Sequence, residues 1–577
     1  MPQASAAEDL PLGSFAPLEP GLGFDEADST MFDLVHDFQT FNGDHNEHFL
    51  AAEWNILDLL PTSAPEYRPQ NSGSGRPNSE SGLSSGLDPI GIPYPTSHFD
   101  TFRTSQPSLE SAPAESRTRH YSIDAPAALV SSLVDIYFER VQPYLPLLHR
   151  PRFYQQYVSG QGYNDMNAAS AFLLYSTMSF SARYSLDPYF ESQPEKERGA
   201  PYALMAQCVL DEAHEYAESQ MFTLEWLQGC ILFAYYHLTC NPKQDTELLA
   251  DKCFQIAYRL GLHELDMGTD ENTSGHGQSQ SAELLPEEVW VTKEEQRRAW
   301  WLVWELDTFL SATLCYPSTI DRSRIHVLLP VSDEAWFTGV PAPSAPIHPD
   351  ISVCWKNLVN LENRNERAWF LVSTHITTHV YELGQRAKIR RNDIEVLERA
   401  RSSFSAVFQN EFGDSIKDPV FDDSNYARKN WLLLSQLMLE STGLVISLLK
   451  EPNSSEQLFT NSVCDVARVA NVNAMTDAME LARMDGHSTC IAGVQQALQS
   501  WSSASEFIPY FSPLTVSMLI GPAFMHVRLA CYSNGSTSSR RTLNSQGRIL
   551  ELILAEFARY WEIGDIIFRA FRASLEG

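Results

Sequence analysis

The chain has 577 residues, and its 41 Lys and Arg against 73 Asp and Glu give a formal net charge of −32. This acidity argues against a protein that grips nucleic acid with its whole surface, because neutralising phosphates needs clustered Lys and Arg. With 43% hydrophobic and 11% aromatic residues, most of the chain must fold. The nine cysteines are scattered without a C-x-x-C pair, which is typical of free thiols in a reducing compartment.

Residues 1–122 differ in composition from the rest. The first 120 residues hold 13 of the 33 prolines and 18 acidic against 5 basic residues, and we predict a disordered acidic Pro/Ser/Gly-rich region. Within it, residues 31–61 interleave Phe, Leu, Trp and Ile with Asp and Glu. Such segments are either activation segments that fold on a partner or short helices that dock on the folded body. A G-x-S-x-G match around Ser84 lies in a Ser/Gly linker and does not indicate a nucleophile elbow.

From residue 123 onward, apolar residues recur at three- and four-residue steps, which predicts helices. The segments 169–185 and 223–238 are apolar on nearly all sides and predict buried helices, and Gly261 suits the end of a following helix. Residues 266–292 form a polar insertion loop. Thr292 and Glu295 then make a capping box that marks the start of the next helix.

The remaining sequence alternates helical runs with loops and shows no sustained strand pattern, so we predict that 123–577 is an all-α, large irregular multi-helix domain. The expected runs are 356–391, 393–412, 427–450, 462–484, 490–503, 514–532 and 547–573. The uncharged stretch 507–527 contains three prolines that would break a spanning helix, so we read two buried segments and no membrane span. No signal peptide is expected either.

Two constellations deserve testing as metal sites. His375 and His379 lie one helical turn apart, but Ile376 stands where a zinc protease needs a general-base Glu. Asp422 and Asp423 are similar to the start of the aspartate-rich magnesium motif of all-helical terpene synthases, but no further carboxylate follows one turn later. We therefore expect no catalytic residue and no metal site in this chain.

Arg297 and Arg298 allow two interpretations. They could bind a phosphate as a pair, but Glu294, Glu295 and Glu305 on the same helical run favour structural ion pairs. Asp307 lies deep in an aromatic run and needs a partner, because burying an unpaired carboxylate is costly. A structural ion pair or cap is the favoured interpretation.

Several segments, taken in order, resemble the fungal-specific transcription factor domain, the middle homology region of binuclear zinc-cluster regulators. They are LVDIYFERVQPYLPLLHRPRFY, LLYSTMSFSARYS, TLEWLQGCILFAYYHL, CFQIAYRLGLHE, EEQRRAWWLVWELDTFLSATLCYPSTI and LPVSDEAWF. The family-signature residues are Arg297, Arg298, Trp300, Trp301, Asp307, Ser311, Pro317 and Ile320. The resemblance covers roughly 123–577. Thr308, Cys315 and Tyr316 depart from it, and we expect there a repacked turn rather than a lost fold.

The resemblance implies a device for reading DNA that this sequence does not show. The family holds two zinc ions with six cysteines, whereas here no Cys precedes Cys208 and no Lys precedes Lys196. We therefore expect no zinc cofactor, no nucleic-acid-binding residues and no direct DNA binding in this chain. Either the regulator acts through a DNA-bound partner regulator, or the gene model has lost its 5′ exon. Formation of a homodimer is a second way in which the chain could associate.

The leading hypothesis is a nuclear fungal transcription regulator of a metabolic or secondary-metabolite gene set, and not an enzyme. Residues 123–577 would be the regulatory domain and could sense a small-molecule effector, for which the sequence names no binding residue. Residues 31–61 would contact the transcription machinery or coactivators. The alternatives are a metabolite-binding helical protein that titrates a full-length regulator, and an all-helical enzyme.

Overall fold

A computed structural model describes the chain over the following ranges. They are 120–158, 163–216, 221–240, 244–267, 286–313, 318–322, 326–361, 364–384, 386, 388–417, 422, 424–450, 508–532 and 537–576. All of them belong to one compact unit, 52–577, and are described within that unit alone. The predicted disordered region 1–122 and the activation segments 31–61 lie outside these ranges, except for residues 120–122.

The all-α prediction is confirmed, because the described residues form helices and no strand. An isolated β-bridge joins Tyr121 to Met166. The helices are α2 (Ala127–Ile136), α3 (Arg150–Phe153), α4 (Ala168–Ser181), α5 (Ala200–Tyr216), α6 (Leu224–Cys240), α7 (Gln244–Arg259), α8 (Glu287–Thr313), α9 (Asp333–Thr338), α10 (Lys356–Val359), α11 (Glu366–Gly384), α12 (Arg391–Lys417), α13 (Tyr426–Leu449), α16 (Leu514–Tyr532), α17 (Thr537–Tyr560) and α18 (Glu562–Glu576).

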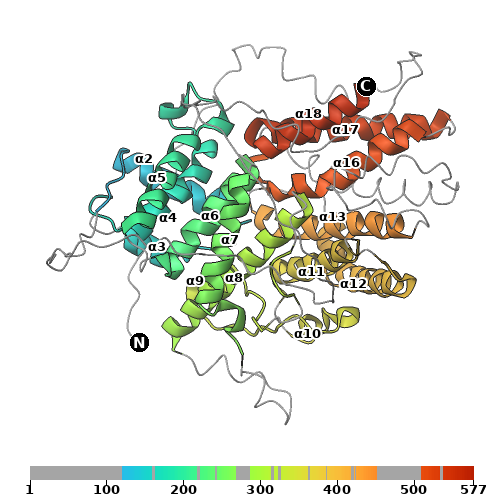
Figure 1. Cartoon of the computed structure of the whole chain (residues 1–577), viewed down its shortest axis with the longest axis horizontal. Helices are drawn as coiled ribbons and strands as arrows, with labels where there is room; N and C mark the ends of the chain where they lie inside the picture. Colours follow the sequence, from blue (N-terminus) through green and yellow to red (C-terminus); the bar gives the residue numbers. More distant parts are fainter. Residues whose placement is uncertain are drawn as a thin grey trace, which may run out of the picture. The chain divides into compact units, whose positions relative to one another are not determined.

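The helices form three groups that follow the chain order (Figure 1). In the first group α4 packs on α5 and α6, and α6 packs on α7 and α8. In the second, α11 and α12 pack on α13, and in the third α16, α17 and α18 pack on one another. The contacts of α8 with α11 and of α6 with α18 join the groups within the unit.

The first group is built on α4 and α6, the two helices predicted to be buried. Every residue of α4 is buried, and Asn167 caps its start by accepting a hydrogen bond from the backbone N–H of Ser170. Gly229 of α6 lets the two helices approach closely, since a Cβ there would lie 2.6 Å from the Phe172 ring. Phe172 also stacks near Trp226, with ring centroids 4.8 Å apart. The apolar character of both helices therefore follows from their central place in the core.

The start of α8 corrects the predicted capping box. The helix begins at Glu287, and Thr292 lies inside it with its hydroxyl bonded to the Glu288 carbonyl. Trp290 of the added turn is buried in a small separate core with Val331 and Trp336. The insertion loop predicted to reach residue 292 thus ends before this turn, because burying Trp290 extends the helix toward its N-terminus.

The structure agrees with some of the other predicted helix ends and differs from the rest. Gly261 has a positive φ of 69° just after α7, as expected at a helix end. The run 356–391 is two helices, α10 and α11, and the run 547–573 is interrupted at Trp561 between α17 and α18. Gly564 allows that turn, since a Cβ there would lie 2.7 Å from the Phe557 backbone. The runs 462–484 and 490–503 lie outside the described residues.

The stretch 507–527 contains most of α16. The expectation that Pro522 breaks a helix there is wrong, since α16 runs through it from Leu514 to Tyr532. None of the helices in the described part of the chain combines the length and the apolar character needed to cross a bilayer.

Candidate functional site

The arginine pair of the signature lies in the N-terminal half of α8, and both guanidinium groups are buried. Arg297 donates to both carboxylate oxygens of Asp266, from Nε at 2.8 Å and from Nη2 at 2.7 Å. Arg298 donates from Nε to Glu294 at 3.1 Å and from Nη2 to the carbonyl of Val331 at 2.6 Å. Asp266, expected in the polar insertion loop, is therefore a buried partner of α8.

Carboxylates outnumber the arginines in this cluster. Asp266, Glu294 and Asp333 face the two guanidinium groups. Burial would lower the pKa of Arg297, but the hydrogen bonds and negative charge of Asp266 outweigh it and raise that pKa. The net charge of the cluster is negative, and this disfavours a bound phosphate. The geometry supports structural ion pairs, the favoured interpretation of the sequence.

The C-terminal half of α8 holds a second closed cluster around Asp307. This carboxylate is fully buried and accepts hydrogen bonds from the Ser318 hydroxyl and the Thr319 backbone N–H, each at 2.8 Å. Arg322 donates to it at 2.5 Å and lies over the Trp304 ring, 4.4 Å from its centroid. Asp307 thus combines both expected roles, an ion pair and a cap on the turn after α8.

A third pair ties α8 to α11. Arg367 donates to Glu305 at 2.8 Å, and both side chains are buried. Burial raises the pKa of Glu305, while the charge of Arg367 acts in the opposite direction. The arginine also lies over the Trp431 ring of α13, 4.8 Å from its centroid. One charged pair thereby links α8, α11 and α13.

The remaining signature residues are partly described. Trp300, Trp301 and Ile320 are buried in the main core, and the Trp301 indole N–H donates to the Leu328 carbonyl at 2.8 Å. The side chain of Ser311 and all of Pro317 lie outside the described residues, as do Cys315 and Tyr316. The described signature residues therefore pack in the main core or bind the loop that follows α8.

The other sequence candidates are not assembled into a site. The rings of His375 and His379 are 4.3 Å apart, but burial lowers the pKa of His375 well below its ordinary value. Asp422 accepts hydrogen bonds from Ser424 and caps the turn before α13, while Asp423 and the motif around Ser84 lie outside the described residues. Among the described residues, no three His, Cys, Asp or Glu side chains are placed to hold a metal ion.

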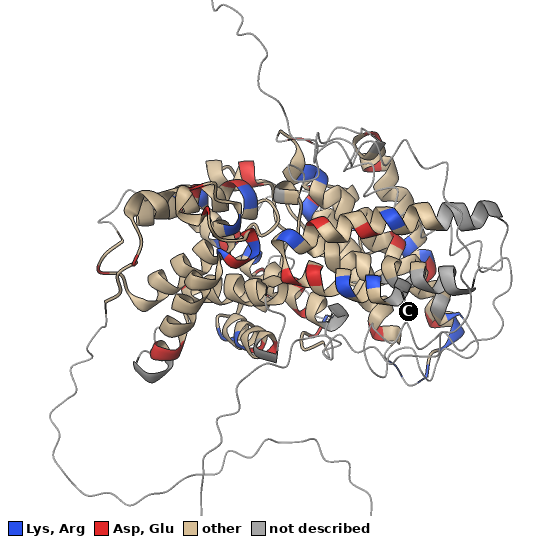
Figure 2. Ribbon diagram, turned by 90° about the horizontal axis from the view of Figure 1, so that it is seen from above, with Lys and Arg blue, Asp and Glu red and all other residues tan. Residues whose placement is uncertain are grey.

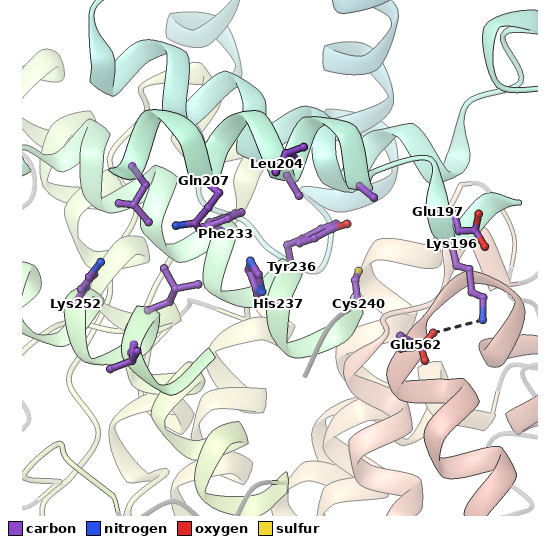
Figure 3. A pocket seen from close by; sticks show the side chains of 15 residues that line it. Lys196, Glu197, Leu204, Gln207, Phe233, Tyr236, His237, Cys240, Lys252 and Glu562 are labelled. Atoms are coloured by element: carbon purple, nitrogen blue, oxygen red, sulfur yellow. Dashed lines mark hydrogen bonds and ion pairs between the residues drawn. The ribbon is translucent and has the colours of Figure 1, made fainter. Parts of the chain in front are cut away.

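A groove between α5, α6 and α7 offers space for a ligand, about 700 Å³ in volume (Figure 3). The lining comes from α5 (Ala203, Leu204, Gln207 and Leu210), from α6 (Phe233, Tyr236, His237 and Cys240), from α7 (Leu248, Leu249 and Lys252), and at one end from Lys196, Glu197 and Glu562. The α6 residues recur every three or four positions, so they share one helical face toward the groove. Sequence reasoning missed this site, because the same spacing is typical of an ordinary core face.

The groove ends against α18. Lys196 Nζ lies 3.4 Å from Glu562 and 3.2 Å from Asp565, the first residues of that helix. Behind Cys240, the buried Arg183 donates to its sulfur at 2.8 Å and to the Tyr560 carbonyl at 2.7 Å. The far end of the groove therefore contacts the turn between α17 and α18.

Charges on the described helices do not form a basic stripe. Figure 2 shows Lys and Arg interspersed with Asp and Glu along these ribbons. A surface that follows a nucleic-acid backbone by charge needs clustered cations. The described helices carry no such cluster in this view.

Comparison with known proteins identifies the first part of the helical unit. Residues 134–371 match the family model of the fungal specific transcription factor domain. The resemblance first seen in the signature residues is confirmed over this segment. No solved structure matches the chain.

Similar proteins are named as regulators of fungal biosynthesis. The chain is 27% identical over 36% of its length to the pigment biosynthesis transcriptional activator pigB of Monascus ruber, and covers 34% of that protein. It is 25% identical over 39% of its length to the sorbicillinoid biosynthetic cluster transcription factor 1 of Penicillium rubens, covering 38%. It is 22% identical over 55% of its length to the tropolone cluster transcription factor tropK of Talaromyces stipitatus, covering 50%. The chain thus spans between a third and a half of these relatives.

Proposed function

We propose that this chain regulates transcription of a secondary-metabolite gene set in a fungus, with the helical domain 123–577 as its regulatory body. One observation carries the proposal, the match of residues 134–371 to the domain model. The similarity to relatives named as regulators of fungal biosynthesis supports it. The family and these relatives indicate a regulator rather than an enzyme.

The proposal assigns different roles to residues 31–61 and to the helical unit. Residues 31–61 contact the transcription machinery or coactivators in the nucleus, since they combine bulky apolar side chains with carboxylates. DNA is reached through a DNA-bound partner regulator, because Arg297 and Arg298 of the helical unit are held in buried ion pairs.

A fusion experiment tests the activator role. Residues 1–122 fused to a neutral DNA-binding domain should activate a reporter, and replacing Phe32, Trp54 and Leu59 with Ser should remove most of that activity. A control fusion carries Ser replacements at Phe99 and Phe102, outside the proposed segments. Absence of activation by the unaltered fusion, with the protein present at normal levels, would contradict the activator role and favour a titrating partner.

A gel shift tests the indirect route to DNA. Purified chain 1–577 should show no sequence-specific complex with promoter DNA at low or moderate salt. Tight binding that weakens steeply with added salt would show direct contact with phosphates and overturn this part of the proposal.

A further inference from the structure

We propose that the groove between α5, α6 and α7 binds an amphiphilic organic anion, whose flat apolar body lies along α6 and whose acidic group is held by Lys252. This inference deepens the proposed function by naming the class of effector, and it rests on that function for its biological role. Binding itself can be measured without DNA or a reporter, so the two ideas can fail separately.

The groove combines a buried apolar floor with an exposed apolar rim. Leu210, Phe233 and Leu249 on the floor are at most 4% exposed, whereas Leu204 and Leu248 on the rim are 65% and 59% exposed. Rim leucines that face an open groove leave apolar surface in water, and a ligand lying between them would remove it. The volume of about 700 Å³ is within the range of organic-ligand sites.

The side chains along the groove favour a flat ligand. Phe233 and His237 meet edge to face, with ring centroids 4.6 Å apart, and Tyr236 continues this aromatic side (Figure 3). Ala203 on α5 faces the same cavity with only a methyl group. A planar ring system lying over Ala203 would meet this side of the groove at the edges of His237 and Tyr236, since Phe233 itself is fully buried, and such edge contacts add to apolar burial.

Charges at the two ends differ and orient the ligand. At the α18 end, Lys196 is held by Glu562 and Asp565, and Glu197 adds another carboxylate to the lining. That end repels an anion. Lys252 lies at the opposite end of the labelled lining, with Gln207 and His237 between it and Tyr236 in this view (Figure 3).

The Lys252 end is suited to an acidic group. An ammonium group has three N–H donors, so it can hold a ligand acid group in addition to contacts within the protein. The Gln207 amide donates one N–H to Asp211 at 2.8 Å and has a second N–H for the ligand. The anionic group of the ligand is therefore placed at Lys252 and its apolar body points toward Tyr236.

A matched pair of fluorescent probes tests both features on the full chain. The anionic probe 8-anilinonaphthalene-1-sulfonate and its uncharged analogue N-phenyl-1-naphthylamine share a flat aromatic body and differ in the sulfonate. We expect saturable binding of the anionic probe at one site per chain. Lys252→Gln should weaken it about threefold to fivefold, the range of a partly exposed ion pair, and leave the neutral probe unchanged. Lys356→Gln on exposed α10 is the control and should change neither.

Substitutions on the rim separate site loss from misfolding. Leu204→Glu should weaken both probes at least fivefold, because it places a carboxylate on an exposed apolar rim, and it should leave the circular dichroism spectrum unchanged. Ala203→Trp should fill the slot and abolish binding. Equal binding of both probes by wild type, Leu204→Glu and Lys252→Gln would overturn the proposal, even if the chain activates transcription. A failed reporter assay with intact probe binding would instead remove the regulatory role and leave the site.

Discussion

Charged side chains have different surroundings in the ion-pair clusters of α8 and in the groove between α5, α6 and α7. In α8 and just after it, the buried arginines Arg297, Arg298 and Arg322 pair with carboxylates of α8 itself or of distant segments. Around the groove, Lys196 pairs with Glu562 and Asp565 at one end, and the half-buried Lys252 lines the cavity at the other. The comparison teaches that the described signature residues of α8 maintain the framework. Less conspicuous residues line the space where a ligand could bind.

The largest expected effect is at Arg298. Arg298→Met should lower the free energy of unfolding by about 3 to 5 kcal/mol, because it leaves the buried Glu294 carboxylate without one of its cations. Urea unfolding of the purified chain measures this loss. Arg391→Met removes an exposed pair with Glu395 and is the matched control, with no measurable change expected. Equal losses in both variants would contradict the expected difference between buried and exposed ion pairs.

A smaller loss is expected at Asp307. Asp307→Asn should lower stability by about 2 to 3 kcal/mol, because the buried Arg322 loses its strongest anionic partner. Arg322→Met and the double variant complete a mutant cycle. The double variant should be less damaged than the sum of the single ones by more than about 1 kcal/mol. Additive losses would mean that the two side chains act independently.

A third prediction asks whether burial of a histidine makes the stability of the fold sensitive to pH. Burial lowers the pKa of His526 in α16 to about 4, so the neutral ring is favoured in the folded state. The stability this gives is complete above pH 6.5 and is lost as the pH falls toward 4. Between pH 7 and pH 5 the wild type should lose about 2 kcal/mol more than His526→Gln in urea unfolding. Parallel losses in both proteins would refute this assignment.

The smallest effect on stability is expected in the groove. Lys252→Gln should change the free energy of unfolding by less than about 0.5 kcal/mol, because this lysine is only half-buried on an open rim. Its effect on the anionic probe should nevertheless be clear. If Lys252→Gln instead lowers the free energy of unfolding by several kcal/mol, Lys252 stabilises the fold as the arginines of α8 do, and the difference between the two regions disappears.

The sequence predicted the helical class and several elements well. The run 514–532 coincides with α16, and 427–450 differs from α13 by one residue at each end. Periodicity succeeds there because a helix repeats its burial pattern locally. It failed at Trp561 and at the start of α8, where packing against distant residues decides whether a turn continues or a helix extends.

The sequence alone predicted a helical domain over 123–577, and it determined that the arginine pair and Asp307 need partners and which family they resemble. The pairing of Arg297 and Arg298 with Glu294 could be predicted from the sequence, since the arginines follow Glu294 by three and four positions. Only the tertiary structure decided that Asp266, Asp333 and Arg367 complete the clusters, and that three helices leave a groove between them. The reason is that spacing along the chain fixes neighbours on one helix, while contacts between helices depend on how their faces pack.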